Sequence, residues 1–184
     1  MQNMTHATFL SLLEQQAEEQ VNQVIAIFQN LPEDQLLNPA EKGGWSIAEC
    51  LEHLNTYAEF YLPRIKKALD KTTPINGSTA FRHGFLGNYF IHTMDPSKTQ
   101  KKYYAMKRHR PKMISDPYTV VARFIQYMEE LVKMIQQAGN KNLMKTRVAT
   151  SISPLVKITA GDALQFVLTH NRRHLEQARR SSNI

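Results

Sequence analysis

Two histidines four residues apart, His170 and His174, are the side chains of this sequence whose type and spacing point most clearly to chemistry. On a helix, this spacing places both imidazoles on one face, about 5–6 Å apart at Cβ. Val167 and Ala178 flank them on the same face, which predicts that this face is buried. A divalent metal would explain two buried imidazoles, because neutral imidazole suits zinc, nickel or iron. The alternative is a pair on a solvated helix face, where the same spacing also occurs.

His53 is the candidate for a third metal ligand. It lies in the middle of a predicted helix, among the apolar residues Leu51 and Leu54. The alternative is that this histidine is a hydrogen-bonded core residue. Three histidines without a fourth protein ligand would leave one coordination position open, as in catalytic rather than structural sites. Cys50 could serve as a ligand or as a thiol, although a buried free cysteine usually packs as a small hydrophobic residue.

Four amphipathic helices are predicted to position these side chains, because apolar residues recur at steps of three and four. The predicted helices cover residues 5–30, 47–70, 117–138 and 160–180. Local start signals support three of them: Ser46 and Glu49 form a capping box, Asp116 precedes Pro117 at the first helical position, and Thr159 is an N-cap with Asp162 in the acidic role of a capping box.

The second and third of these helices are joined by a long, turn-rich connection, residues 71–115. A short helix over residues 81–94 is expected within it. No strand is predicted, since the alternation over residues 144–158 is poor. A 45-residue connection is too long for a hairpin but suits a crossover between parallel helices. The sequence therefore predicts an all-α protein, a four-helix bundle formed by residues 1–184 as a single domain.

Composition excludes several classes of protein. Of the 184 residues, 42% are hydrophobic and 21% are charged, as in globular domains. No apolar stretch approaches the 18 residues of a membrane span, and the first residues do not resemble a secretory signal. A single cysteine excludes an intrachain disulfide framework and fits a reducing compartment. We therefore expect a cytoplasmic protein without membrane partners.

The net charge of +7 is unevenly distributed. Residues 1–41 carry six acidic and no basic side chains, whereas residues 98–112 carry seven basic and no acidic ones, with Tyr103 and Tyr104 among them. Such a run can bind nucleic acid through phosphates and stacked bases. It matches no known nucleic-acid-binding motif, so we favour a solvated loop or a patch that meets the acidic N-terminal helix.

Two segments of the sequence resemble the DinB-like superfamily, which includes the YfiT-like putative metal-dependent hydrolases. Trp45-Ser46 followed by His53 is similar to its first signature, and His170, Arg173, His174 and Gln177 are similar to its closing His-x-x-Arg-His-x-x-Gln motif. The resemblance spans residues 5–180. It implies an up-down-down-up four-helix bundle, often a homodimer, with His53, His170 and His174 as metal ligands. Members with assigned chemistry are thiol S-transferases or isomerases that use low-molecular-weight thiols.

The function expected from residues and resemblance together is that of a metal-dependent enzyme, a thiol S-transferase or hydrolase acting on a small molecule. The alternatives are a non-catalytic metal-binding stress protein and, less favoured, nucleic-acid binding through residues 98–112. Among neighbours that could accept a hydrogen bond from a ligand histidine, Gln177 is preferred over Glu52 and Glu176. Tyr57 is a candidate to contact substrate or to pack, and Trp45 to pack the helix entry. His83, His92 and His109 are expected to be solvated loop residues.

Overall fold

The computed structural model describes residues 4–40, 43–75, 80–99, 101 and 103–181, and these are mostly helical. Four helices exceed 20 residues among the described residues. In chain order the elements are β1 (Met4–Thr5), α1 (His6–Ile27), α2 (Glu33–Leu37), α3 (Ile47–Asp70), β2 (Ala80–Phe81), α4 (Phe85–Met94), the 3₁₀ helix η1 (Lys107–His109), α5 (Pro117–Gln137), β3 (Arg147–Ala149), β4 (Lys157–Thr159) and α6 (Ala160–Ser181).

The long helices begin where their capping residues predict. The Ser46 hydroxyl accepts from the Glu49 N–H and the Glu49 carboxylate accepts from the Ser46 N–H, so the predicted capping box starts α3. Asp116 accepts from the N–H groups of the first turn of α5, which opens with Pro117. These bonds satisfy backbone donors that would otherwise lack partners, and they fix the start of each helix.

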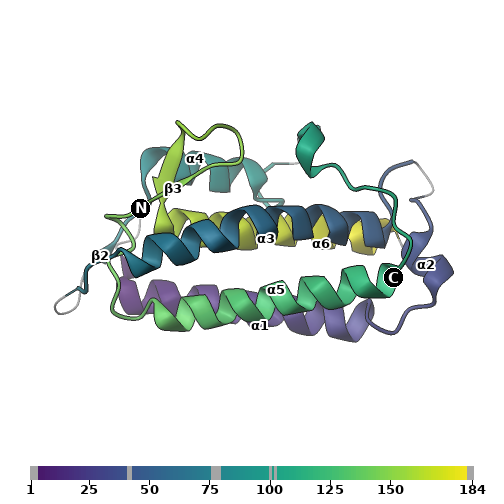
Figure 1. The fold of residues 1–184 in the computed structure, drawn as a ribbon, viewed down its shortest axis with the longest axis horizontal. Helices are drawn as coiled ribbons and strands as arrows, with labels where there is room; N and C mark the ends of the chain where they lie inside the picture. The colour runs from purple at the N-terminus through teal and green to yellow at the C-terminus, as the bar shows by residue number, and fades with distance from the viewer. Residues whose placement is uncertain (1–3, 41–42, 76–79, 100, 102, 182–184) are drawn as a thin grey trace.

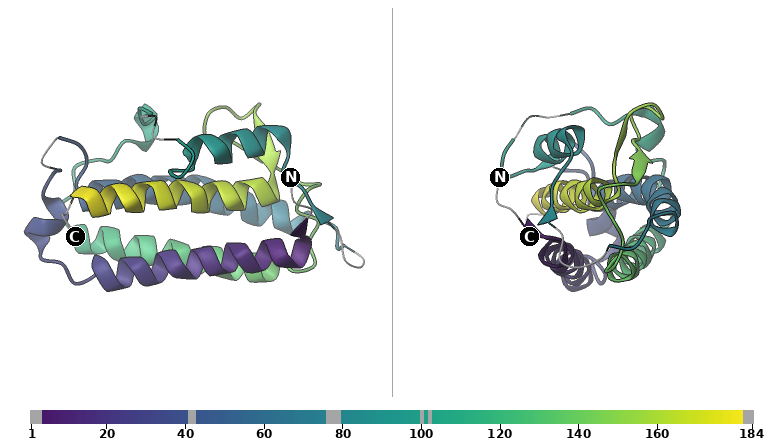
Figure 2. Two further views of the ribbon diagram at one scale, coloured as in Figure 1. Left: turned by 180° about the vertical axis from the view of Figure 1, so that it is seen from behind. Right: turned by 90° about the vertical axis from the view of Figure 1, so that its left-hand side faces the viewer.

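The four long helices lie side by side (Figures 1 and 2). Helix α3, which carries His53, packs against α5 and α6, and α1 packs against the other sides of α5 and α6. Their buried faces form one apolar cluster that includes Leu13, Leu51, Phe124, Leu131 and Leu164. Helix α3 and the histidine-bearing α6 are therefore direct neighbours, and burial holds their facing sides in a fixed relation.

Short strands and one short helix are corrections to the predicted elements. β1 pairs with β2, and β3 pairs with β4, both antiparallel. Strands of two or three residues are too short to give a period-two pattern, which is why the sequence shows none. Helix α2 begins directly after Pro32, between the first two predicted helices, where no helix is predicted. The short helix predicted over residues 81–94 is present as α4 but begins only at Phe85, because Phe81 belongs to β2.

Helix α4 lies along α6 (Figure 2) and is attached to it by Asp162. The Thr159 hydroxyl accepts from the Asp162 N–H at 3.1 Å, as an N-cap does. A capping box would also require the Asp162 carboxylate to accept a hydrogen bond from the Thr159 N–H. The carboxylate does not do so, which corrects the prediction. It is fully buried and accepts from His83 Nδ1 at 2.7 Å and from the Gly84 N–H at 3.1 Å, because the crossover brings these donors to it.

The basic residues of the crossover do not meet the acidic helix α1, a correction to one of the two expectations for them. Helix η1 packs on α3, on the side of the molecule opposite α1 (Figures 1 and 2). Lys107, Arg108, Arg110 and Lys112 are exposed, while Lys102 lies outside the described residues. In the described part of the chain, no helix has both the length and the apolarity needed to cross a membrane.

Candidate metal centre

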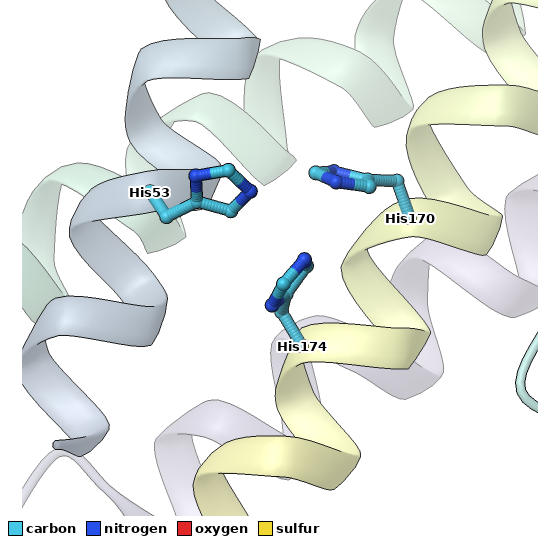
Figure 3. Close-up of side chains that lie close together, drawn as sticks. All are labelled: His53, His170 and His174. Carbon is cyan, nitrogen blue, oxygen red and sulfur yellow. The ribbon is translucent and has the colours of Figure 1, made fainter. Parts of the chain in front are cut away.

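Three imidazoles converge in the contact between α3 and α6. His53 comes from the middle of α3, and His170 and His174 occupy successive turns of α6 (Figure 3). One ring nitrogen of each lies within 4.8 Å of one from each of the other two. The ring centroids are 4.5 Å apart for His53 and His174, 4.7 Å for His170 and His174, and 5.2 Å for His53 and His170. Residues 117 positions apart in sequence thus form one compact group.

Hydrogen bonds fix the tautomers of two of these rings. His53 Nδ1 lies 2.6 Å from the main-chain oxygen of His109, and a carbonyl oxygen can only accept. His53 therefore carries its proton on Nδ1, and its Nε2 lone pair is free. His174 Nδ1 donates in the same way to Oε1 of Gln177 at 3.0 Å. Ligand histidines are typically oriented by such bonds from the nitrogen that does not bind the metal.

Burial keeps the three imidazoles neutral. It lowers the pKa of His53 to about 4, an effect that the bond to the His109 carbonyl partly offsets. Burial, together with the neighbouring His53, lowers the pKa of His174 to about 3. The pKa of His170 lies well below its ordinary value for the same reason, with His174 and His53 adding to the effect. At neutral pH all three rings are in the form that binds a metal.

The donor set fits a divalent transition metal. Three neutral imidazoles suit zinc, nickel or iron, and they leave one or more coordination positions for water or substrate. His170 Nδ1 is buried, and no described residue forms a hydrogen bond with it. Its unmet bonding capacity is unusual in a folded protein and is consistent with a group of atoms organised around a ligand.

Two aromatic side chains enclose the histidines. The ring of Trp45 lies 4.7 Å from that of His53 and 5.8 Å from that of His174. Trp45 therefore packs the entry of α3, as expected, and also covers the group. Tyr57, one turn after His53, lies 5.0 Å from the ring of His53 and 4.2 Å from that of His170. Both aromatic rings therefore pack directly against the histidine group.

His109 is the residue of this region that sequence reasoning missed. It was expected to be a solvated loop residue, but only 3% of it is exposed, and its carbonyl is the acceptor for His53. Its ring lies 4.2 Å from that of Tyr57. No spacing or motif marks it, because the contact is made by a main-chain oxygen at the end of a long connection.

The other candidates lie outside the group. Cys50 is fully buried, and its burial raises its pKa to about 12, so it holds a protonated thiol rather than a metal-binding thiolate. Glu52 pairs with Arg123, and Glu176 pairs with Arg180. Their engagement elsewhere agrees with the preference for Gln177. His92 is exposed on α4, as expected, whereas His83 is bound to Asp162.

Comparison with known proteins gives one finding. The model of the DinB superfamily matches residues 16–178, which include all three histidines. Neither the curated proteins nor the solved structures give a significant match. Because the family model covers most of the chain, the chain belongs to the DinB superfamily.

Proposed function

We propose that this DinB superfamily protein is a metal-dependent enzyme in which His53, His170 and His174 hold one divalent transition metal ion. One observation carries the proposal: three neutral imidazoles from two helices lie with ring nitrogens within 4.8 Å of one another. The reaction class is S-transfer from a low-molecular-weight thiol, or hydrolysis, on a small-molecule substrate. The family resemblance favours the thiol.

The chemistry that such an ion supplies is a lowered pKa for a bound water or thiol, which gives a nucleophile at neutral pH. The chain itself supplies orientation and exclusion of water. The His109 carbonyl and Gln177 hold the Nδ1 protons of His53 and His174 away from the centre. Trp45 and Tyr57 cover the rings and lower the local polarity, which strengthens any electrostatic interaction there.

The architecture that goes with this function is an up-down-down-up four-helix bundle formed by residues 1–184 as one domain. The side-by-side packing of α1, α3, α5 and α6 supports it (Figure 1). A homodimer and a cytoplasmic location complete the proposal. The family resemblance supports the first, and the single cysteine supports the second.

Metal content tests the proposal first. Untagged protein, dialysed after loading with zinc, nickel or iron, should retain about one ion per chain. His170→Ala should lose the ion, because two imidazole ligands alone bind it too weakly to retain it through dialysis. The matched control is His92→Ala, which removes an exposed histidine of α4. Retention of equal metal by wild type and His170→Ala would contradict the proposed site.

Catalysis needs a separate test, since a stress protein could bind metal without reacting. A panel of electrophiles is incubated with several small thiols and metal-loaded protein, with His53→Ala and His92→Ala in parallel. Turnover by wild type and His92→Ala, but not by His53→Ala, is the expected result. Equal rates in all three proteins would contradict the enzyme and leave the metal-binding alternative. If residues 98–112 bind nucleic acid, the measured affinity should fall steeply as the salt concentration rises.

A further inference from the structure

The turn Lys107–His109, in the crossover before α5, is hydrogen-bonded to α3 beside the candidate metal centre. His53 Nδ1 donates to the main-chain oxygen of His109 at 2.6 Å. In return, the side chain of His109 contacts Thr56, one turn along α3, with 3.0 Å between Nδ1 and the hydroxyl oxygen. The Thr56 hydroxyl donates to the main-chain oxygen of His53 at 2.8 Å. Residues 53 and 109 are thus linked twice, once through each side chain.

The direction of these bonds is settled by counting protons. The Thr56 hydroxyl has one proton, and it is used on the His53 carbonyl, so the hydroxyl accepts from His109. His109 therefore carries its proton on Nδ1, and its buried Nε2 has no hydrogen-bond partner in the part of the chain that the structure describes. The side chain of His109 has only this one polar contact among the described residues. The ring is therefore buried although one of its two nitrogens makes no hydrogen bond to a described residue. Such buried unpaired groups are unusual in folded proteins, so a functional role is worth considering.

We propose that His109 is a positioning residue for the metal centre. Its side chain fastens the turn Lys107–His109 to α3, so that the main-chain carbonyl of the same residue holds the His53 imidazole with Nε2 toward His170 and His174. The proposal rests on the proposed function, because it assigns His109 a role toward the same ion. The crossover would then orient a metal ligand in addition to connecting α3 to α5.

Earlier in the same crossover, Thr99 and Lys101 contact α6, the helix that carries His170 and His174. Arg173, the neighbour of His174, donates to the main-chain oxygens of Thr99 and Lys101. Its guanidinium also lies 5.7 Å from the ring centroid of Tyr103. The crossover is therefore anchored on α6 by Arg173 and on α3 by His109, beside one ligand in each case. Loss of either anchor should loosen the histidine next to it.

Cobalt titration of four variants tests the proposal, with Co²⁺ as the probe because its visible spectrum reports coordination geometry. His109→Ala and Thr56→Val each remove the side-chain link, and each should weaken Co²⁺ binding about 10–100-fold and alter the spectrum. His109→Asn keeps a donor near the position of Nδ1, and Thr56→Ser keeps the hydroxyl. Both should stay within a few-fold of wild type. His92→Ala is the control for loss of a histidine elsewhere.

The double variant His109→Ala/Thr56→Val separates positioning from general packing. If the two residues act through one link, the double variant should bind Co²⁺ about as weakly as either single variant. Unchanged affinity and spectrum in folded His109→Ala and Thr56→Val, with only a lower melting temperature, would overturn the proposal. Failure of wild type itself to bind Co²⁺ would instead overturn the proposed function and, with it, the metal-directed role of His109.

Nitrogen NMR of the metal-free protein gives a readout that does not depend on metal. The His53 ring should be the Nδ1-protonated tautomer in wild type and in His109→Asn. In His109→Ala the carbonyl acceptor is no longer held in place, and the ring should exchange between tautomers. A pure Nδ1-H tautomer in both His109→Ala and Thr56→Val would show that the turn needs no fastening, and it would contradict the proposal.

Discussion

Neutral imidazole rings are the residue-scale property on which the centre depends. An exposed pair at the same spacing would be partly protonated near neutral pH, and protons would compete with any metal for the ring nitrogens. His170 is buried and His174 is half-buried against α3, and desolvation lowers the pKa of both rings, which removes this competition. The structure thus favours the buried alternative for this pair over the solvated one.

Gln177 should matter for metal affinity, because its amide oxygen accepts the Nδ1 proton of His174. Gln177→Ala is expected to weaken zinc binding on the order of 10-fold, the usual effect of losing such a partner. Competition with a chromophoric chelator measures it. The control is Glu176→Ala, whose carboxylate pairs with Arg180 and contacts no ligand histidine. Equal affinities for the two variants would contradict a role for Gln177.

The stability of the metal-free protein should fall in mild acid. Unfolded histidine has a pKa near 6.5, whereas folded His53 and His174 titrate at about 4 and about 3. Between these values the unfolded chain binds more protons, so stability is complete above pH 6.5 and is lost as the pH falls toward 4. Each histidine contributes up to about 1.4 kcal/mol per pH unit.

Denaturant unfolding with a chelator present, at pH values from 7.5 to 4.5, measures this dependence. The double variant His53→Gln/His174→Gln lacks two of the buried titrating rings and should give a shallower curve than wild type. A wild-type free energy of unfolding that stays constant over this range would mean that the rings are not buried as described.

Sequence spacing was enough to find the histidine pair but not the whole centre. His170 and His174 follow from a local rule, whereas His53 is a candidate from its place in a predicted helix and a ligand only by the DinB resemblance. The acceptor for His53 is a main-chain oxygen of His109, and a backbone carbonyl has no residue-type signature. Only the tertiary course of the crossover brings it there, so it could not be predicted.

At the scale of elements, prediction succeeded where the signal is local. The capping residues at Ser46 and Asp116 placed the starts of α3 and α5, because a cap is a bond between residues two or three apart. The strands were missed because each has only two or three residues, too few for a periodic pattern, and β1 and β2 are also far apart in sequence. Asp162 was predicted to complete a cap, but it binds His83 across 79 positions.

Close packing of α4 on α6 should make Gly87 hard to replace. A Cβ built at Gly87 would overlap the Asp162 carboxyl group, which is fully buried and bonded to His83. Gly87→Ala is therefore expected to lower the free energy of unfolding by about 1–3 kcal/mol. Gly139→Ala is the control, since its Cβ would meet only the Gln136 carbonyl oxygen at 3.6 Å. Equal stabilities of the two variants would argue against close contact of α4 with α6.

At the scale of the whole molecule, a metal that joins α3 to α6 should stabilise the fold. Zinc at 100 times its dissociation constant should add about 2.7 kcal/mol if it binds only the folded chain. For a chain of 184 residues this corresponds to about 5–10 °C in melting temperature. Thermal unfolding with and without zinc measures it, and His170→Ala should show little shift. An equal shift in that variant would place the bound metal elsewhere.

X-ray absorption of wild-type protein loaded with one equivalent of zinc reports the ligands of the ion itself. We expect three imidazole nitrogens at about 2.0–2.1 Å from the ion, with a remaining position filled by water or thiol. The triple variant His53→Ala/His170→Ala/His174→Ala should retain no zinc after dialysis. A first shell with fewer than three imidazoles, or tightly held zinc in the triple variant, would contradict the account.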